Sequence, residues 1–119
     1  SDVCSSDLIV EDARFDAKLT KTDLPGDPVF PRWLFHYWAT HLRIVPQPSF
    51  LIDTTGWADR KREAVLAYKS QFVDNPGNRR VVEWLDAAGT YFGSRIGTAA
   101  AEPFFAREPL GLTSLDALA

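Results

Sequence analysis

The chain has 119 residues, of which 45% are hydrophobic and 24% charged, so its composition is that of one ordinary globular domain. Its net charge of -3 and pI near 5.3 lack the basic surplus of nucleic-acid-binding domains, so no nucleic-acid partner is expected. It has no run of about 18 apolar residues, so no membrane span is expected, and a single cysteine excludes an internal disulfide.

The chain opens on a polar stretch, SDVCSSDL, which holds the single cysteine, Cys4. This stretch has no basic residue and no apolar segment, so it is not a secretory signal. Residues 8–19, LIVEDARFDAKL, carry apolar side chains at loosely helical spacing and predict the end of a helix. The loop TKTDLPGDPVFP, rich in proline, follows this helix and ends it.

Two short segments after this loop have the composition of strands. RWLFHYWAT, residues 32–40, is crowded with aromatic side chains, and SFLID, residues 49–53, is short, apolar and preceded by two prolines. The sequence therefore predicts two strands that pair or lie next to each other.

After Asp53 the spacing of the apolar residues changes from that of a strand to that of a helix. Asp53, Thr54 or Thr55 can cap a helix that begins near Trp57. The charged cluster DRKRE, residues 59–63, is expected to be a solvated face of this helix with local ion pairs. The predicted apolar stripe, at spacings of three and four, consists of Trp57, Lys61, Ala64, Val65, Tyr68 and Phe72.

A second amphipathic helix is predicted after the Asn-Pro-Gly break in VDNPGN. This helix should close near Gly93 or Gly97, because glycine is favoured just after a helix ends. Its apolar face consists of Val81, Trp84, Leu85, Ala88, Tyr91, Phe92 and Ile96. The segment AAAEPFFAREPLGL then predicts a short strand followed by irregular chain.

The chain has two histidines, His36 and His41. A separation of five residues places them on opposite faces of a regular strand, and neither has a helical zinc-binding spacing. The expected role of each is a hydrogen-bonded histidine in or beside the core. His41 is the better functional candidate, because it lies at the end of the predicted strand, where loops carry active sites.

Three sequence pieces carry a resemblance to a known family. They are the strand with Pro-Ser-Phe, two apolar residues and Asp53, the helix with Lys61 and Tyr68-x-Ser70-Gln71-Phe72, and the segment Ala101-Glu102-Pro103-Phe104. Over roughly residues 9–119 the chain resembles the C-terminal half of the LmbE-like (PIG-L) zinc-dependent N-deacetylases. Within that family it is most similar to the bacillithiol-biosynthesis deacetylases.

The resemblance implies an α/β fold: the C-terminal part of a Rossmann-like deacetylase domain, with an incomplete sheet and two long helices. It implies a cytoplasmic hydrolase that removes the acetyl group from an N-acetylated glycoside, N-acetylglucosaminyl-malate, and that can be a homo-oligomer at full length. Members of the family use zinc, which lowers the pKa of a bound water. Both His-Pro-Asp motifs that supply the metal ligands and the general base are absent here. This chain is therefore expected to bind no zinc, to have no catalytic residue of its own and to be inactive alone.

Of the family's active site, the resemblance places only part of the substrate-binding wall in this chain. We expect His41 and Arg43, in the loop after the aromatic strand, to bind substrate, with Gln71 as a weaker third residue. Arg43 could hold an acidic aglycone such as malate by a charge-assisted pair of hydrogen bonds. The competing interpretation of Arg43 is a solvated loop cation.

The opening stretch SDVCSSDL resembles the translation of a common short-read sequencing adapter. On this hypothesis residues 1–8 are an artefact, and residues 9–119 are the C-terminal fragment of one deacetylase domain. Such a fragment should leave apolar surface exposed and should be marginally stable or aggregate. The alternative is a standalone small binding or oligomerisation module whose contact face consists of Trp33, Phe35, Tyr37 and Trp38.

Overall fold

The fold was obtained as a computed structural model that describes residues 5–38 and 47–118. It divides the chain into two compact units, one ending at Leu34 and the other beginning at Phe35. Within the described residues, no helix combines the length and the apolar character that crossing a membrane requires.

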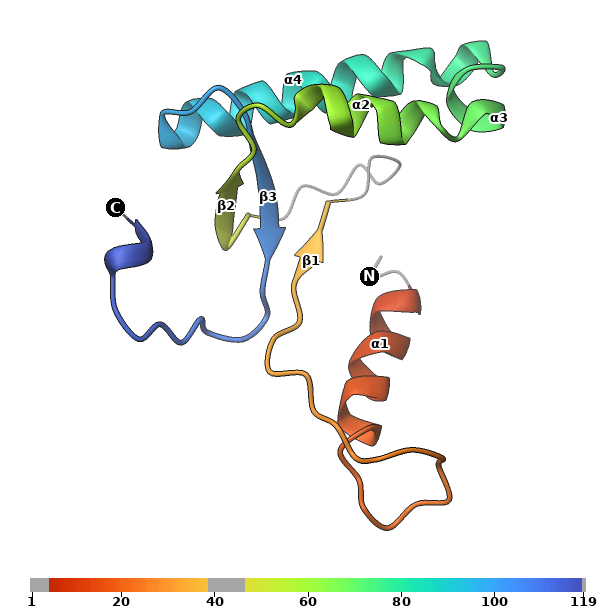
Figure 1. Cartoon of the computed structure of the whole chain (residues 1–119), viewed down its shortest axis with the longest axis vertical. Coiled ribbons are helices and arrows are strands. Elements are labelled where there is room, and N and C mark those ends of the chain that lie inside the picture. Colours follow the sequence, from red (N-terminus) through yellow and green to blue (C-terminus); the bar gives the residue numbers. More distant parts are fainter. Residues whose placement is uncertain (1–4, 39–46, 119) are drawn as a thin grey trace. The chain divides into compact units, whose positions relative to one another are not determined.

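The first unit is built on α1, Ser5–Asp16, and the loop that follows it (Figure 1). The predicted helix is confirmed, although it ends at Asp16 rather than near residue 19, and it continues through the proposed boundary between residues 8 and 9. Arg14 holds the returning chain: its Nε donates to the Pro31 carbonyl at 2.9 Å and its Nη2 to the Arg32 carbonyl at 2.7 Å. Its guanidinium also lies 4.5 Å from the centre of the Phe30 ring.

Within the described residues, the second unit has three strands that form one antiparallel sheet (Figure 1): β1, His36–Tyr37, β2, Phe50–Asp53, and β3, Ala101–Phe105. The predictions of β2 and β3 are confirmed. The prediction for residues 32–40 is wrong in length, since only two of the described residues there form a strand. The predicted neighbour relation is also wrong, because β3 lies between β1 and β2 and pairs with both.

The helix predicted to continue to Phe72 is interrupted. α2 covers Ala58–Leu66, and α3, Lys69–Phe72, begins only after Tyr68, whose ψ of 66° leaves the helical region. The predicted cap is also wrong, since the residue at the N-cap of α2 is Trp57. Of the two long helices expected, one is therefore two shorter pieces.

The second predicted helix is confirmed as α4, Arg79–Ile96, which follows the short 3-10 helix η1, Pro76–Asn78. Gly97 ends α4 with a φ of 73°, in the left-handed region where glycine is unstrained, and its N–H donates to the Gly93 carbonyl. Of the two predicted closing glycines, Gly97 is therefore the terminal one. α2 and α4 lie side by side and run in opposite directions (Figure 1).

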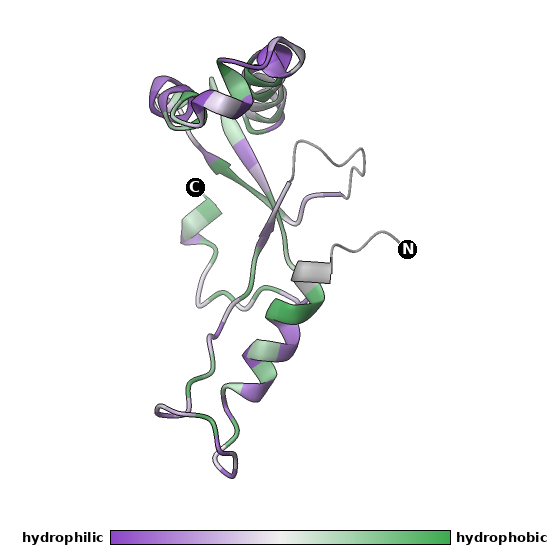
Figure 2. Ribbon diagram, turned by 90° about the vertical axis from the view of Figure 1, so that its right-hand side faces the viewer, coloured by the Kyte–Doolittle hydropathy of each residue, from purple (hydrophilic) through white to green (hydrophobic). Residues whose placement is uncertain are grey.

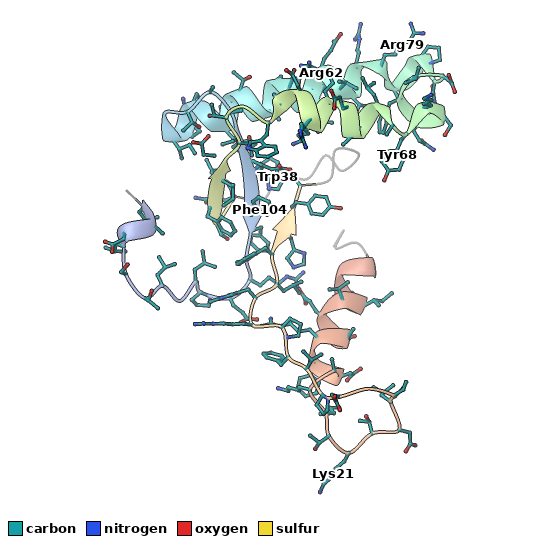
Figure 3. The ribbon with its side chains drawn as sticks, viewed as in Figure 1. Lys21, Trp38, Arg62, Tyr68, Arg79 and Phe104 are labelled. Atoms are coloured by element: carbon teal, nitrogen blue, oxygen red, sulfur yellow. The ribbon has the colours of Figure 1, made fainter. Side chains whose placement is uncertain are left out.

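The core lies where α4 packs on β3. Phe92 is 7% exposed and Ala101 2%, and these are the buried hydrophobic side chains recorded among the described residues. Trp38 packs edge-on against Phe92 with ring centres 5.0 Å apart, beneath the helices in Figure 3. α4 approaches the chain after it closely at Gly93, where an added Cβ would lie 2.6 Å from the Thr98 carbonyl oxygen. The second unit is thus a small α/β arrangement with a core at one helix-strand contact.

Large apolar side chains remain exposed in both units, and Figure 2 shows apolar residues interleaved with polar ones along the helices. Several belong to the stripes predicted to pack: Trp57, Tyr68, Trp84 and Tyr91 are 60%, 67%, 61% and 58% exposed. Trp57, Trp84 and Tyr91 have the periodicity of a buried face without the partner that would bury it, whereas Tyr68 lies at the break between α2 and α3. An ordinary domain of this size covers more of its apolar surface.

Candidate functional site

Two of the three predicted substrate-binding residues, His41 and Arg43, lie outside the described residues. The third, Gln71, is exposed in α3, and its backbone carbonyl accepts a hydrogen bond from Asn78 Nδ2 at 3.0 Å. The carbonyl of Gln71 therefore ties α3 to the start of α4. The substrate wall formed by these three predicted residues stays a prediction.

The described residues do not fit a zinc ion. Among them, no group of three or more His, Cys, Asp or Glu side chains is close enough to hold a metal. His36 is opposite Phe105 in the sheet, with the ring centres 6.2 Å apart. We therefore assign no chemical step to a metal in this part of the chain.

The two strand pieces behind the family resemblance pair with each other in the structure, and the helical piece reaches them through Lys61. β2 carries the Pro-Ser-Phe piece and pairs with β3, which carries the Ala-Glu-Pro-Phe piece, so that Ile52 is opposite Glu102. From the helical piece, Lys61 Nζ reaches Glu102 Oε1 at 3.2 Å. Residues up to about 50 positions apart are thus direct partners, through strand pairing and through one ion pair from α2 to β3.

A tight turn connects β2 to α2. Asp53 Oδ1 accepts hydrogen bonds from the Thr55 N–H at 2.9 Å and from the Thr55 hydroxyl at 2.6 Å. The hydroxyl bond first, and then the backbone bond, lower the pKa of Asp53 because both favour the charged carboxylate. The N–H of Thr54 donates to the Ala100 carbonyl at 3.0 Å, which fastens this turn to the segment before β3.

Arg62 links α2 to α4. Its Nη2 lies 2.7 Å from Asp86 Oδ2, and its Nη1 lies 3.1 Å from Asp59 Oδ1 (Arg62 is labelled in Figure 3). Asp86, the larger influence, and Asp59 both raise the pKa of Arg62 because they stabilise its charge. The predicted local pairing within residues 59–63 is confirmed for Arg62 and Asp59. The bridge to Asp86, 24 residues further on, was missed because sequence spacing carries no signal for it.

One face of the sheet carries a group of stacked aromatic rings. The rings of Phe50 and Phe104 are nearly parallel with centres 5.4 Å apart, and Phe35 meets Phe50 edge-on at 5.0 Å. Tyr37 is opposite Phe104 in the register, which places it on the same face. We call Phe35, Tyr37, Phe50 and Phe104 the aromatic sheet face.

The structure divides the aromatic set proposed from sequence as a contact face. Phe35 and Tyr37 belong to the aromatic sheet face and are 41% and 72% exposed. Trp38 instead packs against Phe92, and its buried Nε1 has no hydrogen-bond partner among the described residues. Trp33 belongs to the first unit. Within the second unit, Trp38 therefore does not share the face that carries Phe35 and Tyr37.

No family model matches the chain. A solved structure is similar to it, that of the conserved protein TT1542 from Thermus thermophilus, with 35% sequence identity and a TM-score of 0.76. The match covers 91% of this chain and 46% of that one, so this chain spans less than half of the neighbour's length. The likeness shows a shared fold over the matched length.

Proposed function

We propose that this chain is the C-terminal part of an LmbE-like (PIG-L) zinc-dependent N-deacetylase with a Rossmann-like fold. The complete enzyme would hydrolyse the acetamide of N-acetylglucosaminyl-malate and release acetate. In this proposal the chain supplies scaffold and part of the substrate wall, and the metal ligands lie in a part of the protein outside it. The isolated chain is accordingly inactive.

The observation that carries the proposal is the meeting of the three resembling pieces. They were selected as sequence signatures, and they make direct contact through the β2–β3 pairing and the ion pair between Lys61 and Glu102. Signatures that belong to one family are expected to be contiguous in space, and these pieces meet that expectation. This arrangement supports the family hypothesis without assigning chemistry to any described residue.

The size of the structural neighbour also supports the proposal. A protein of that length has more than half of its chain beyond the part matched here, which leaves room for a metal-binding region. This region would face whatever substrate contacts the present chain supplies. For those contacts we retain His41 and Arg43, with Gln71 as the weaker third residue, as predictions.

The first experiment is to sequence the source locus across the codons for residues 1–20 and several hundred bases upstream. We expect the codons for SDVCSSDL to be absent and an in-frame region with both His-Pro-Asp motifs to precede residue 9. Genomic codons for residues 1–8 that directly follow a start codon, with a stop codon upstream, would overturn the proposal.

The second experiment measures acetate release by the complete reading frame loaded with zinc, with the isolated chain as the inactive comparison. Arg43→Gln should raise the KM for N-acetylglucosaminyl-malate by roughly 10- to 100-fold, the equivalent of one charge-assisted interaction. It should leave the KM for the neutral methyl glycoside unchanged. The matched control is Arg80→Gln, on the exposed surface of α4. Equal effects on both substrates would remove Arg43 from the aglycone site.

The second candidate function is a standalone binding or oligomerisation module. It is favoured by one observation, the 72% exposure of Tyr37 beside Phe35 on the aromatic sheet face. The locus sequence separates the two proposals, because a standalone module requires no upstream metal-binding region.

A further inference from the structure

The two faces of the sheet have different surroundings. On one face, α4 packs on β3, and Ala101 and Pro103 are buried. The alternate residues of β3, Glu102 and Phe104, point to the other face, since side chains alternate along a strand. This second face is the aromatic sheet face and its continuation toward α2.

The second face does not have the composition of a solvated sheet surface. An antiparallel sheet with one wet face alternates apolar and polar residues, so the wet face is polar. Here β2 contributes Phe50 and Ile52 to this face, and Ile52 is 48% exposed. The charged residue that β3 contributes, Glu102, is paired with Lys61. The composition of this face is therefore that of a buried surface.

The aromatic rings on this face are already ordered against one another. The Phe50 ring contacts Phe35 on one side and Phe104 on the other, so that the three rings form a row. Tyr37 lies opposite Phe104 in the strand register. Aromatic rows of this kind bury large areas when a second layer packs on them. Tyr37 is the most exposed residue of the aromatic sheet face, at 72%, and a second layer would cover it.

We propose that the aromatic sheet face is an internal packing interface, covered by the part of the polypeptide that corresponds to the unmatched portion of the Thermus thermophilus protein. This inference rests on the part of the proposed function that places further polypeptide beyond the present chain, and it is independent of the deacetylase chemistry. The neighbour adopts the same fold at 35% identity while carrying more than as much chain again. That additional chain is a specific occupant for an apolar face that the described residues of the second unit leave open.

A second copy of this chain is the competing occupant. A dimer would also cover Tyr37. It would not account for the additional chain that the Thermus thermophilus protein carries beyond the matched part. The exposed apolar residues are moreover spread over both units, as Ile9 at 67%, Trp84 at 61% and Tyr37 at 72% exposure show. Covering surface on so many elements requires a large additional part of a domain rather than one two-fold contact.

The test is a chimera in which the full 119-residue chain is joined to the unmatched part of the Thermus protein, in the order of that protein's own chain. Two variants are compared: Tyr37→Glu, on the aromatic sheet face, and Tyr68→Glu, between α2 and α3. Both tyrosines are exposed in the isolated chain, at 72% and 67%, so the two substitutions are matched in residue type and exposure.

The expected result is a monodisperse chimera with a cooperative melt. Tyr37→Glu should lower its Tm by at least about 5 °C, because the new carboxylate would be buried without a partner, and Tyr68→Glu by no more than about 2 °C. In the isolated chain the two variants should behave alike.

Three results would overturn the proposal. They are equal Tm shifts for the two variants, a chimera that aggregates, and an isolated chain that forms a discrete dimer which Tyr37→Glu dissociates. The readout involves neither zinc nor acetate release. A chimera without deacetylase activity that still shows the Tyr37-specific shift would therefore reject the proposed function and support this interface.

Discussion

α1 and α4 both carry apolar side chains at helical spacing, more regularly in α4, and their surroundings differ. Both have polar residues between these side chains. In α4, Phe92 is buried against Trp38 and Gly93 lets the following chain come close. In α1, the apolar side chains from Leu8 onward stay exposed: Leu8 49%, Ile9 67%, Val10 47% and Phe15 55%.

The difference teaches that periodicity predicts a helix but not the partner of its apolar face. Cations contribute to holding α1 on its own loop, since the Arg14 guanidinium lies 4.5 Å and Lys18 Nζ 5.0 Å from the centre of the Phe30 ring. Such exposed cation-π contacts are worth about 0.5–1 kcal/mol each. A buried aromatic residue contributes several times more, so the stability of this chain should be concentrated where α4 meets the sheet.

The largest expected effect tests whether the stability of the chain depends mainly on the contact between α4 and the sheet. Phe92→Ala removes the most buried aromatic ring together with its contacts to Trp38 and Tyr91. The cost of about 3–5 kcal/mol should abolish the cooperative unfolding transition, because the chain is expected to be only marginally stable. Phe15→Ala, in α1, should cost less than about 1 kcal/mol, because the ring is 55% exposed. Urea unfolding followed by circular dichroism measures both. Equal losses would mean that α1 has a buried partner and that the contrast between the helices is wrong.

The next effect distinguishes two glycines inside α4. A Cβ at Gly93 would lie 2.6 Å from the Thr98 carbonyl oxygen, and backbone atoms cannot move aside cheaply, so Gly93→Ala should destabilise by about 1–3 kcal/mol. A Cβ at Gly89 would lie 3.9 Å from the Ala101 carbonyl oxygen, an ordinary contact. Gly89→Ala should therefore stabilise the chain by about 0.5–1 kcal/mol through helix propensity. Shifts of the same sign in the urea midpoint would contradict the close approach at Gly93.

A smaller effect concerns the ion pair that joins two of the resembling sequence pieces. Lys61 and Glu102 are 42% and 33% exposed, so their coupling should be about 0.2–1 kcal/mol and should weaken in high salt. A double-mutant cycle with Lys61→Met and Glu102→Gln measures it. Lys69→Met, in α3, provides the control for the loss of a lysine charge. A coupling of zero at low salt would show that the pairing of the strands alone holds these pieces together.

Local chemistry made much of the fold predictable. β2 and β3 follow from short apolar runs, and Gly97 at the end of α4 follows from the preference for glycine after a helix. The interruption at Tyr68 could not be predicted, because no glycine or proline marks it. The central place of β3 was also hidden, since it depends on pairing between residues about 50–70 positions apart.

The candidate site was less predictable than the fold. Gln71 is exposed, and its described hydrogen bond is made by its backbone, so its side-chain role depends on groups that the described residues do not include. The contacts that the structure does add, Lys61 with Glu102 and Arg62 with Asp86, join helices and strands far apart in sequence. Side-chain pairs of this kind follow from tertiary packing, which one sequence does not specify residue by residue.

The smallest expected effect is a pH dependence at the turn between β2 and α2. Hydrogen bonds from Thr55 lower the pKa of Asp53 in the folded chain, so its stabilising contribution is fully present above the ordinary carboxylate pKa. That contribution is lost as the pH falls through the lowered folded value, because protonation removes the acceptor. Thr55→Val should raise the Asp53 pKa measured by NMR titration, since the hydroxyl bond is the larger cause of the shift. Thr54→Val keeps the backbone bond to Ala100 and should leave that pKa unchanged. An Asp53 pKa that moves equally in both variants would mean that the turn itself, rather than the hydroxyl, sets the carboxylate's charge.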